Sequence, residues 1–157
     1  MLFYPKVGTD MKKILLCGKI KPMAEIFKPK VVLALIEKSG KLLLIRRKVK
    51  LLKLEWAFPG GVTHEGETDE EAVIREAKEE VDIDVKPVKK LLERKHPDTF
   101  VQVVYFHCKP KGSESPKIKE AYEISEVAWV PEKEVLEKFT SDVDPIIQKF
   151  ILSHSRS

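Results

Sequence analysis

The chain has 157 residues, with 29 basic and 25 acidic side chains and a formal net charge of +4. This length supports one domain with a substantial core, and a hydrophobic content of 43% is ordinary for a soluble globular protein. The charges are interspersed, so a nucleic-acid partner is not expected, and the apolar runs are too short to predict a membrane span.

The sequence favours a reducing cytoplasm. Basic residues at Lys12 and Lys13 are followed by an apolar run over residues 14–17, which is too short for a signal peptide. The two cysteines, Cys17 and Cys108, do not suggest a disulfide framework. The chain has no Asn and only two Gln beside abundant Lys and Glu, a bias that favours a thermophilic source.

Regular hydrophobic patterns begin near residue 30. Residues 1–28 show no long period, and we interpret them as an N-terminal extension of unknown role before a single domain over residues 29–157. Ser39 and Gly40 predict a turn between the first two strands. The predicted strands cover residues 31–37, 41–47, 85–95, 100–109 and 127–130.

The segments between these strands carry loop and turn signals. Residues 48–55 are expected to form a loop before Trp56. Residues 58–61, Phe-Pro-Gly-Gly, predict a turn that lets the backbone approach other groups closely. Residues 96–99, His-Pro-Asp-Thr, predict the turn between the third and fourth strands.

A helix is expected to follow the glycines. Thr68 and Glu71 form a T-x-x-E capping box, which starts a helix. Ile74, Ala77 and Val81 recur at helical spacing and give an apolar stripe on that helix.

Two more helices are predicted near the end of the chain. Pro131 would open one of them in the favoured first position. The last begins at residues 144–145, Asp-Pro, and runs to about residue 153. Its buried side would be drawn from Ile146, Phe150 and Ile151.

Three glutamates crowd one face of the first predicted helix. Glu76, Glu79 and Glu80 project within an arc of roughly 100°, because a helix turns 100° per residue. Like charges at this spacing cost a few tenths of a kcal/mol per pair. Glutamate-rich helices are usually just solvated, but a cation among these carboxylates would reverse the cost. Mg²⁺ commonly bridges carboxylates to substrate phosphates, so the pattern indicates a metal site for phosphate chemistry.

The stretch over residues 61–83 resembles the Nudix box, G-x5-E-x7-R-E-U-x-E-E-x-G-U, where U is a bulky aliphatic residue. Two positions depart from the pattern: Ala77 replaces a bulky residue, and Asp82 stands where the family has Gly. Asp tolerates a left-handed conformation better than most residues do. The positions that match are Gly61, Glu67, Arg75, Glu76, Glu79, Glu80 and Ile83.

The resemblance implies an α/β fold, with a mixed β-sheet sandwiched between α-helices, over roughly residues 30–152. It also implies a hydrolase that cleaves the pyrophosphate bridge of a nucleoside diphosphate linked to another moiety. Glu79 and Glu80 would ligate Mg²⁺ or Mn²⁺, Glu76 would complete the cluster, and Gly61 would contribute through its backbone. Glu67 and Arg75 would be structural, fixing the loop against the helix.

Residues outside the box are candidates for the base and for substrate recognition. Family members differ in their general base, and we favour Glu123 over Glu120, because its spacing to Trp129 resembles a loop that supplies the base in some members. Strand alternation sends Arg46 and Arg47 to opposite faces, and the resemblance favours Arg47 as the phosphate ligand. For the nucleobase, the stacking candidates are Tyr105, Phe106, Trp56 and Trp129, although an aromatic residue in a strand is more often part of the core. Asp142 or Asp144 could form a hydrogen bond to the base.

The sequence leaves the substrate open. We favour nucleoside triphosphates, followed by ADP-ribose or nucleotide sugars and then by dinucleoside polyphosphates. Val143 stands where MutT-like relatives often carry a polar residue that reads a purine, which weighs against selectivity for oxidised guanine. A catalytically silent nucleotide-binding regulator and a hydrolase of RNA 5′ ends are the alternatives from other classes. The expected partner is a small nucleotide, and the sequence is compatible with a homodimer without requiring one.

Overall fold

The computed structural model describes residues 27–48, 55–97, 99–113 and 115–154. The predicted N-terminal extension therefore lies outside the described residues, apart from residues 27 and 28. Most of the predicted loop at residues 48–55 lies outside them too.

The described residues form a seven-stranded mixed sheet. Its strands are β1 (Val31–Lys38), β2 (Lys41–Arg47), β3 (Trp56–Ala57), β4 (Gly60–Val62), β5 (Val85–Lys95), β6 (Gln102–Pro110) and β7 (Ile124–Pro131).

The main differences from the predicted strands lie at the ends of elements. The turn predicted at residues 58–61 is wrong for its two glycines, which begin strand β4 and pair with β1. Strand β6 begins at Gln102 and not at residue 100, because Phe100 takes a left-handed conformation with φ of 58°. Strand β7 extends beyond the predicted residues at both ends because it pairs with β2 along its whole length.

Strand β1 changes its partner along its length. Its first residues, 31–33, pair antiparallel with β4, whereas Glu37 and Lys38 at its end pair with β2. On its other side β1 runs parallel to β6, which in turn pairs antiparallel with the edge strand β5. Strand β2 continues beside β3 and β7. The hairpin strands β1 and β2 therefore diverge, and the end of β2 approaches β7 and not β1.

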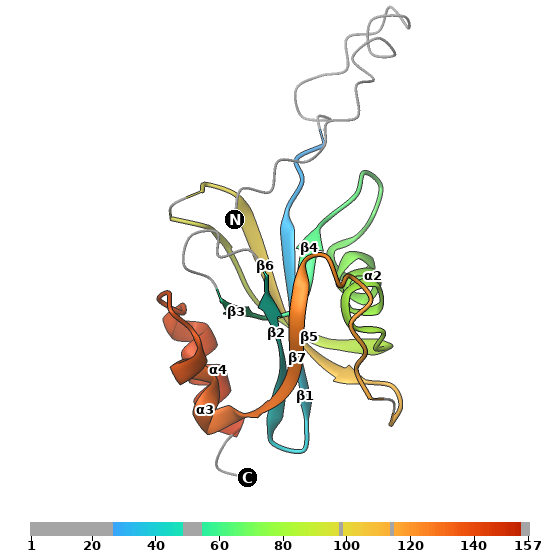
Figure 1. Ribbon diagram of the computed structural model, residues 1–157. Helices are drawn as coiled ribbons and strands as arrows, with labels where there is room; N and C mark the ends of the chain where they lie inside the picture. Colours follow the sequence, from blue (N-terminus) through green and yellow to red (C-terminus); the bar gives the residue numbers. More distant parts are fainter. Residues whose placement is uncertain (1–26, 49–54, 98, 114, 155–157) are drawn as a thin grey trace, which may run out of the picture.

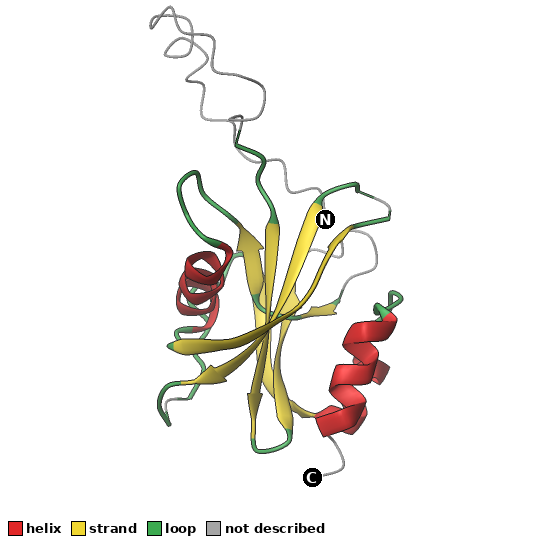
Figure 2. Ribbon diagram, turned by 180° about the vertical axis from the view of Figure 1, so that it is seen from behind, coloured by secondary structure: helices red, strands yellow, loops and turns green. Residues whose placement is uncertain are grey.

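Helices cover both faces of this sheet, as predicted (Figure 1). Helix α2 (Asp69–Val81) lies on one face, and helices α3 (Glu132–Lys138) and α4 (Pro145–His154) lie together on the other. The view from behind shows the same three layers (Figure 2). No helix in the described part of the chain is both long enough and apolar enough to cross a membrane.

The two faces of the sheet bury separate hydrophobic clusters, because side chains alternate along each strand. On β6, Val104 and Phe106 pack in the cluster that contains the apolar residues of α2. Val103 and Tyr105 pack in the cluster that contains Val135 of α3. The carboxylate-bearing helix and the C-terminal helices therefore occupy opposite sides of the sheet.

Helix α2 begins where the capping box predicts. The Thr68 side chain accepts a hydrogen bond from the Glu71 backbone N–H, and the Glu71 carboxylate accepts one from the Thr68 N–H, which completes the capping box. Asp82 forms the C-cap with φ of 56°, in the left-handed region. The substitution of Asp for the Gly of the box is therefore accommodated in this chain.

The last two helices differ slightly from the prediction. Pro131 is the N-cap of α3 and not its first residue. In α4, Ile147 and Ile151 are fully buried, whereas Ile146 is 52% exposed. The assignment of Ile146 to the buried side was wrong because the contact face of α4 is set by the sheet below it. The sequence has two adjacent isoleucines, Ile146 and Ile147, and their hydropathy does not show which of them faces the sheet.

Gly60 offers a test of how tightly β4 packs on β1. A Cβ at this position would overlap the carbonyl oxygen of Val32 and lie 3.0 Å from the Leu33 Cα, both of which are backbone atoms that cannot rotate away. We expect Gly60→Ala to lower the free energy of unfolding by about 3 kcal/mol, as severe overpacking does. Urea unfolding of the variant measures this loss.

Gly112→Ala is the matched control, because a Cβ there would meet nothing within 4 Å. It should leave stability within about 0.5 kcal/mol of the wild-type value. Equal stabilities for the two variants would contradict the described packing of β4.

Candidate active site

The most deeply buried carboxylate of α2 belongs to Glu80, whose side chain is 3% exposed. Its Oε2 accepts a hydrogen bond from the Gly60 backbone N–H at 2.8 Å, and its Oε1 accepts one from Arg47 Nη2 at 3.2 Å. Burial raises the pKa of Glu80 to about 7, although Arg47 and the Gly60 N–H act in the opposite direction. Gly60 could not be predicted as a partner of Glu80 from the sequence, because the glycine pair resembled a simple turn.

Glu76 rests directly on strand β4. A Cβ added at Gly61 would lie 2.5 Å from the carboxylate of Glu76, so any larger residue would force that carboxylate to move from its present position. Burial raises the pKa of Glu76, and the nearby Arg75 only partly opposes this rise. The first glycine of the predicted box therefore has a steric role in this chain, because it allows a carboxylate to lie against the backbone.

Glu79 is the exposed member of the three, with a side chain that is 50% accessible. Its Oε2 lies 3.1 Å from Arg75 Nη1, and the same nitrogen lies 2.7 Å from Glu76 Oε1. The three carboxylates thus share one side of α2 as predicted, but at three different depths.

Arg75 joins helix α2 to the preceding loop. It donates to Glu67 Oε1 at 2.7 Å, to Glu67 Oε2 at 3.0 Å and to the Val62 carbonyl at 2.9 Å. The hydrogen bond from Arg75 lowers the pKa of Glu67, and a further bond from the His64 N–H acts in the same direction. These contacts are those of a structural pair that fixes the loop against the helix.

The segment between β6 and β7 is tied to the C-terminal end of α2. The backbone N–H of Lys117 donates to the Val81 carbonyl at 2.9 Å, and that of Lys119 donates to the Glu80 carbonyl at 3.1 Å. The next residue is Glu120, which is brought near the helix carboxylates. Burial raises the pKa of Glu120, and repulsion from Glu123 and Glu79 adds to the rise.

Glu123 lies three residues further along the same segment. Its side chain is 46% exposed, with Oε2 3.5 Å from Arg47 Nη1. Its carbonyl accepts a hydrogen bond from the Lys48 N–H at 2.8 Å. Glu120, by contrast, makes no ion pair with any described residue. Both predicted candidates for the base therefore lie beside α2, but in different electrostatic surroundings.

The two adjacent arginines of β2 have different partners, as strand alternation predicts. Arg47 contacts Glu80 and Glu123. Arg46 contacts Glu55 and Glu126 instead, and its guanidinium lies 6.0 Å from the centre of the Trp56 ring. Of these two arginines, only Arg47 contacts a carboxylate of α2.

Two of the residues suggested for nucleobase recognition, Tyr105 and Asp142, lie elsewhere. Tyr105 is 9% exposed and packs in the cluster on the α3 and α4 side of the sheet. Asp142 is exposed in the segment before α4. The structure does not place either of them among the carboxylates of α2.

The donor set fits a hard divalent cation. Three carboxylates, with the backbone of Gly61 against one of them, are the oxygen ligands that Mg²⁺ and Mn²⁺ prefer. No group of three or more Asp, Glu, His or Cys side chains within the described ranges is already arranged to hold a metal ion. The three carboxylates are paired with Arg75 and Arg47 instead, so ion binding would require these side chains to rearrange.

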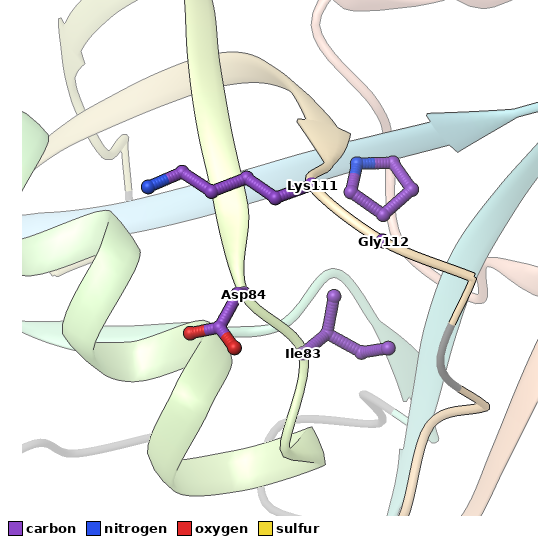
Figure 3. Close-up of a pocket in the computed structure, with 5 residues that line it drawn as sticks. Ile83, Asp84, Lys111 and Gly112 are labelled. Atoms are coloured by element: carbon purple, nitrogen blue, oxygen red, sulfur yellow. The ribbon is translucent and has the colours of Figure 1, made fainter.

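A surface hollow of about 250 Å³ lies just beyond the end of α2 (Figure 3). It is lined by Ile83, Asp84, Pro110, Lys111 and Gly112. The side chains of Asp84 and Lys111 extend to the same side in this view. None of the carboxylates described above lines the hollow, so it is separate from the candidate active site.

The sequence model of the NUDIX domain matches residues 27–150. One curated relative is the ADP-ribose pyrophosphatase of Methanocaldococcus jannaschii, 44% identical over 82 residues, which cover 52% of this chain and 48% of that protein. Another is the RNA pyrophosphohydrolase of Hydrogenovibrio crunogenus, 38% identical over 68 residues, which cover 43% of this chain and 39% of that protein. The matches thus span less than half of either relative.

Solved structures support the same architecture. The crystal structure of a MutT protein from Methanosarcina mazei Go1 has a TM-score of 0.60 and 26% identity to this chain. The superposition covers 83% of this chain and 96% of that one. The predicted α/β fold, a mixed sheet between helices, is confirmed.

Glu80 predicts a specific pH dependence of stability. Its pKa is about 7 in the folded protein, compared with an ordinary value of 4.5. The folded state therefore binds this proton more tightly, and the resulting stabilisation is complete below pH 4.5 and lost as the pH rises through 7. The metal-free protein should lose about 3 kcal/mol of unfolding free energy over this range through Glu80, at roughly 1.4 kcal/mol per pKa unit.

Chemical unfolding between pH 4.5 and 8 in the presence of a chelator measures this loss. Glu80→Gln should flatten the pH profile, whereas Glu70→Gln, a change at an exposed position in the same helix, should not. Parallel profiles for the wild type and Glu80→Gln would show that Glu80 has an ordinary pKa.

Proposed function

This chain belongs to the NUDIX domain family, and we propose that it is a metal-dependent pyrophosphohydrolase. Its substrate would be a nucleoside diphosphate linked to another group. The observation that carries the proposal is the placement of Glu76 and Glu80 in a desolvated site against two glycines, with Glu79 beside them. Desolvated carboxylates gathered in this way have little structural benefit, because their burial costs free energy.

Glu76, Glu79 and Glu80, with the backbone of Gly61, would hold Mg²⁺ or Mn²⁺. The bound cation would supply neutralisation of the phosphate charge and would favour attack by water on phosphorus. The structural pair of Glu67 and Arg75 would hold the loop in place while the carboxylates reorganise.

We assign the general base to Glu120 in preference to Glu123, the reverse of the order favoured by the sequence. Glu123 Oε2 lies 3.5 Å from Arg47 Nη1 and so already has a cationic partner. Glu120 faces the helix carboxylates, and its pKa is raised by burial and by neighbouring negative charge. A raised pKa makes a carboxylate a stronger base near neutral pH. Arg47 is the proposed phosphate ligand, because its planar guanidinium can bind two phosphate oxygens at once.

For the substrate, we place ADP-ribose ahead of the nucleoside triphosphates that the sequence favoured. The support is the relative at 44% identity, an ADP-ribose pyrophosphatase. Val143, which packs against the cluster beneath α3 and α4, offers no side-chain hydrogen bond to a purine. The burial of Tyr105 removes one stacking candidate from this choice.

An RNA 5′ end is the second candidate, supported by the relative named RNA pyrophosphohydrolase. Binding of a polyanionic chain would weaken steeply with salt, because each neutralised phosphate releases counterions. Binding of ADP-ribose, which carries only two phosphates, would be less sensitive to salt.

The metal-ligand assignment predicts the effect of removing one charge from the site. Glu79→Gln and Glu80→Gln should each lower kcat by roughly two orders of magnitude or more, because the variants lose electrostatic stabilisation of the transition state. Turnover should be measured with Mg²⁺ on ADP-ribose, nucleoside triphosphates, dinucleoside polyphosphates and triphosphorylated RNA, with Glu70→Gln as the control.

Glu70 is exposed in the first turn of the same helix, away from the carboxylate group, so its variant should retain wild-type rates. Near-normal turnover by both Glu79→Gln and Glu80→Gln would refute the assigned site. If the wild type cleaves none of these substrates, the proposed substrate classes are wrong.

The assignment of Glu120 as the general base predicts that substitutions of Glu120 and Glu123 lower kcat by different amounts. Glu120→Gln should lower kcat by about 100-fold or more, which is within the range for loss of a general base. Glu123→Gln should change kcat by less than about tenfold, a difference measured in steady-state assays at saturating Mg²⁺. A larger loss in Glu123→Gln would restore the order that the sequence favoured.

A further inference from the structure

Each of the three carboxylates in the candidate site already has a cationic partner. Arg75 Nη1 lies 2.7 Å from Glu76 Oε1 and 3.1 Å from Glu79 Oε2. Arg47 Nη2 lies 3.2 Å from Glu80 Oε1. Two guanidinium groups therefore provide the compensating charge that a divalent cation would otherwise provide.

These two arginines differ in how firmly they are held. Arg75 also binds both oxygens of Glu67 and the Val62 carbonyl, so it keeps several partners when a carboxylate leaves it. Among the described residues, the Arg47 side chain forms ion pairs with two carboxylates, those of Glu80 and Glu123. Arg47 is thus the arginine that can be released from the site.

The backbone of β2 holds Arg47 between two segments of the site. The pairing of β2 with β7 shifts register between Arg46 and Arg47, and the Arg47 N–H donates to the Glu55 carbonyl at 2.9 Å. The guanidinium therefore contacts α2 on one side and the Glu120–Glu123 segment on the other. Its side chain is only 12% exposed.

A divalent cation and a guanidinium would compete for Glu80. Two like charges at contact distance repel strongly in a poorly solvated site, and Glu80 Oε2 is already bound by the Gly60 N–H. The remaining oxygen, Oε1, is the one that Arg47 occupies. A cation that binds this oxygen would lie beside the Arg47 guanidinium, and the repulsion between the two positive charges favours displacement of Arg47.

We propose that Arg47 is an internal counter-cation of the metal-free protein, displaced from Glu80 by the incoming metal ion and then free to bind a substrate phosphate. This inference rests on the proposed function, because it assumes that the carboxylates bind a divalent cation. Binding of the metal ion and binding of the phosphate would then be coupled, because the metal ion releases Arg47, which binds the phosphate.

The proposal predicts opposite effects of one substitution on two ligands. In Arg47→Met, Mn²⁺ alone should bind about tenfold more tightly than in the wild type, equivalent to roughly 1.4 kcal/mol, because no guanidinium competes. Inorganic phosphate should bind the Mn²⁺-saturated variant about tenfold more weakly, because its ligand is missing. A residue with a purely structural role would weaken both. Both affinities can be measured by calorimetry at pH 9, where Glu80 is ionised.

Arg46→Met is the matched control, because it removes the same side chain from the adjacent position. Arg46 contacts Glu55 and Glu126 and none of the three helix carboxylates. Its Mn²⁺ affinity should therefore stay within about twofold of the wild-type value, a difference of roughly 0.4 kcal/mol.

A second measurement uses the wild-type protein and does not depend on the folding of a variant. Side-chain NMR signals of ¹⁵N-labelled arginine should shift for Arg47 on addition of Mg²⁺, while those of Arg46 stay in place. Unchanged Arg47 signals at saturating Mg²⁺ would overturn the inference.

The outcomes separate this inference from the proposed function. If the wild type binds Mn²⁺ and Arg47→Met binds it equally or more weakly, Arg47 is not a competitor, although the metal site stands. If the wild type binds no Mn²⁺, both the metal site and the role of Arg47 are wrong.

Discussion

Desolvation of carboxylates on one side of helix α2 is the constraint to which the rest of the site responds. Glu80 and Glu76 are pressed against β4, where Gly60 donates a backbone N–H and Gly61 leaves space for a side chain. A carboxylate removed from water is costly unless hydrogen bonds or opposite charges compensate it. The partial compensation here still leaves the pKa of Glu80 at about 7.

The fold supplies that compensation from three separate segments. The divergence of β1 from β2 allows β4 to pair with the start of β1 and directs the end of β2, with Arg47, toward α2. The loop before α2 is fixed by Glu67 and Arg75. The segment after β6 is fixed by hydrogen bonds to the last carbonyl groups of the helix. One short helix is thus surrounded by elements that are distant in the sequence.

Local rules predicted helix α2 well because its signals are contained within it. The capping box at Thr68 depends only on neighbouring residues and is confirmed. Asp82 adopts the left-handed conformation that Asp tolerates better than most residues do. The alternation of Arg46 and Arg47 was equally predictable, because a strand has a period of two. The resemblance to the Nudix box then supplied the fold, which periodicity alone could not do.

Features that depend on tertiary contacts were not predictable. Gly60 resembled part of a turn, but it is a strand residue whose N–H binds Glu80, a contact between segments 20 positions apart. Ile146 and Ile147 cannot be distinguished by hydropathy, and the sheet beneath α4 decides which one is buried. The contacts of Arg47 with Glu80 and Glu123 were not predicted, because the end of β2 approaches α2 only where β1 and β2 diverge. Substrate choice depends on such contacts as well.

Crystallography with Mn²⁺ and a non-hydrolysable ADP-ribose analogue tests the central claim most directly. The account predicts an anomalous scattering peak within coordination distance of Glu79 and Glu80, close to Glu76 and the Gly61 backbone, with a phosphate of the analogue beside it. Bound analogue without a peak among these carboxylates, or with Mn²⁺ held elsewhere, would contradict the account.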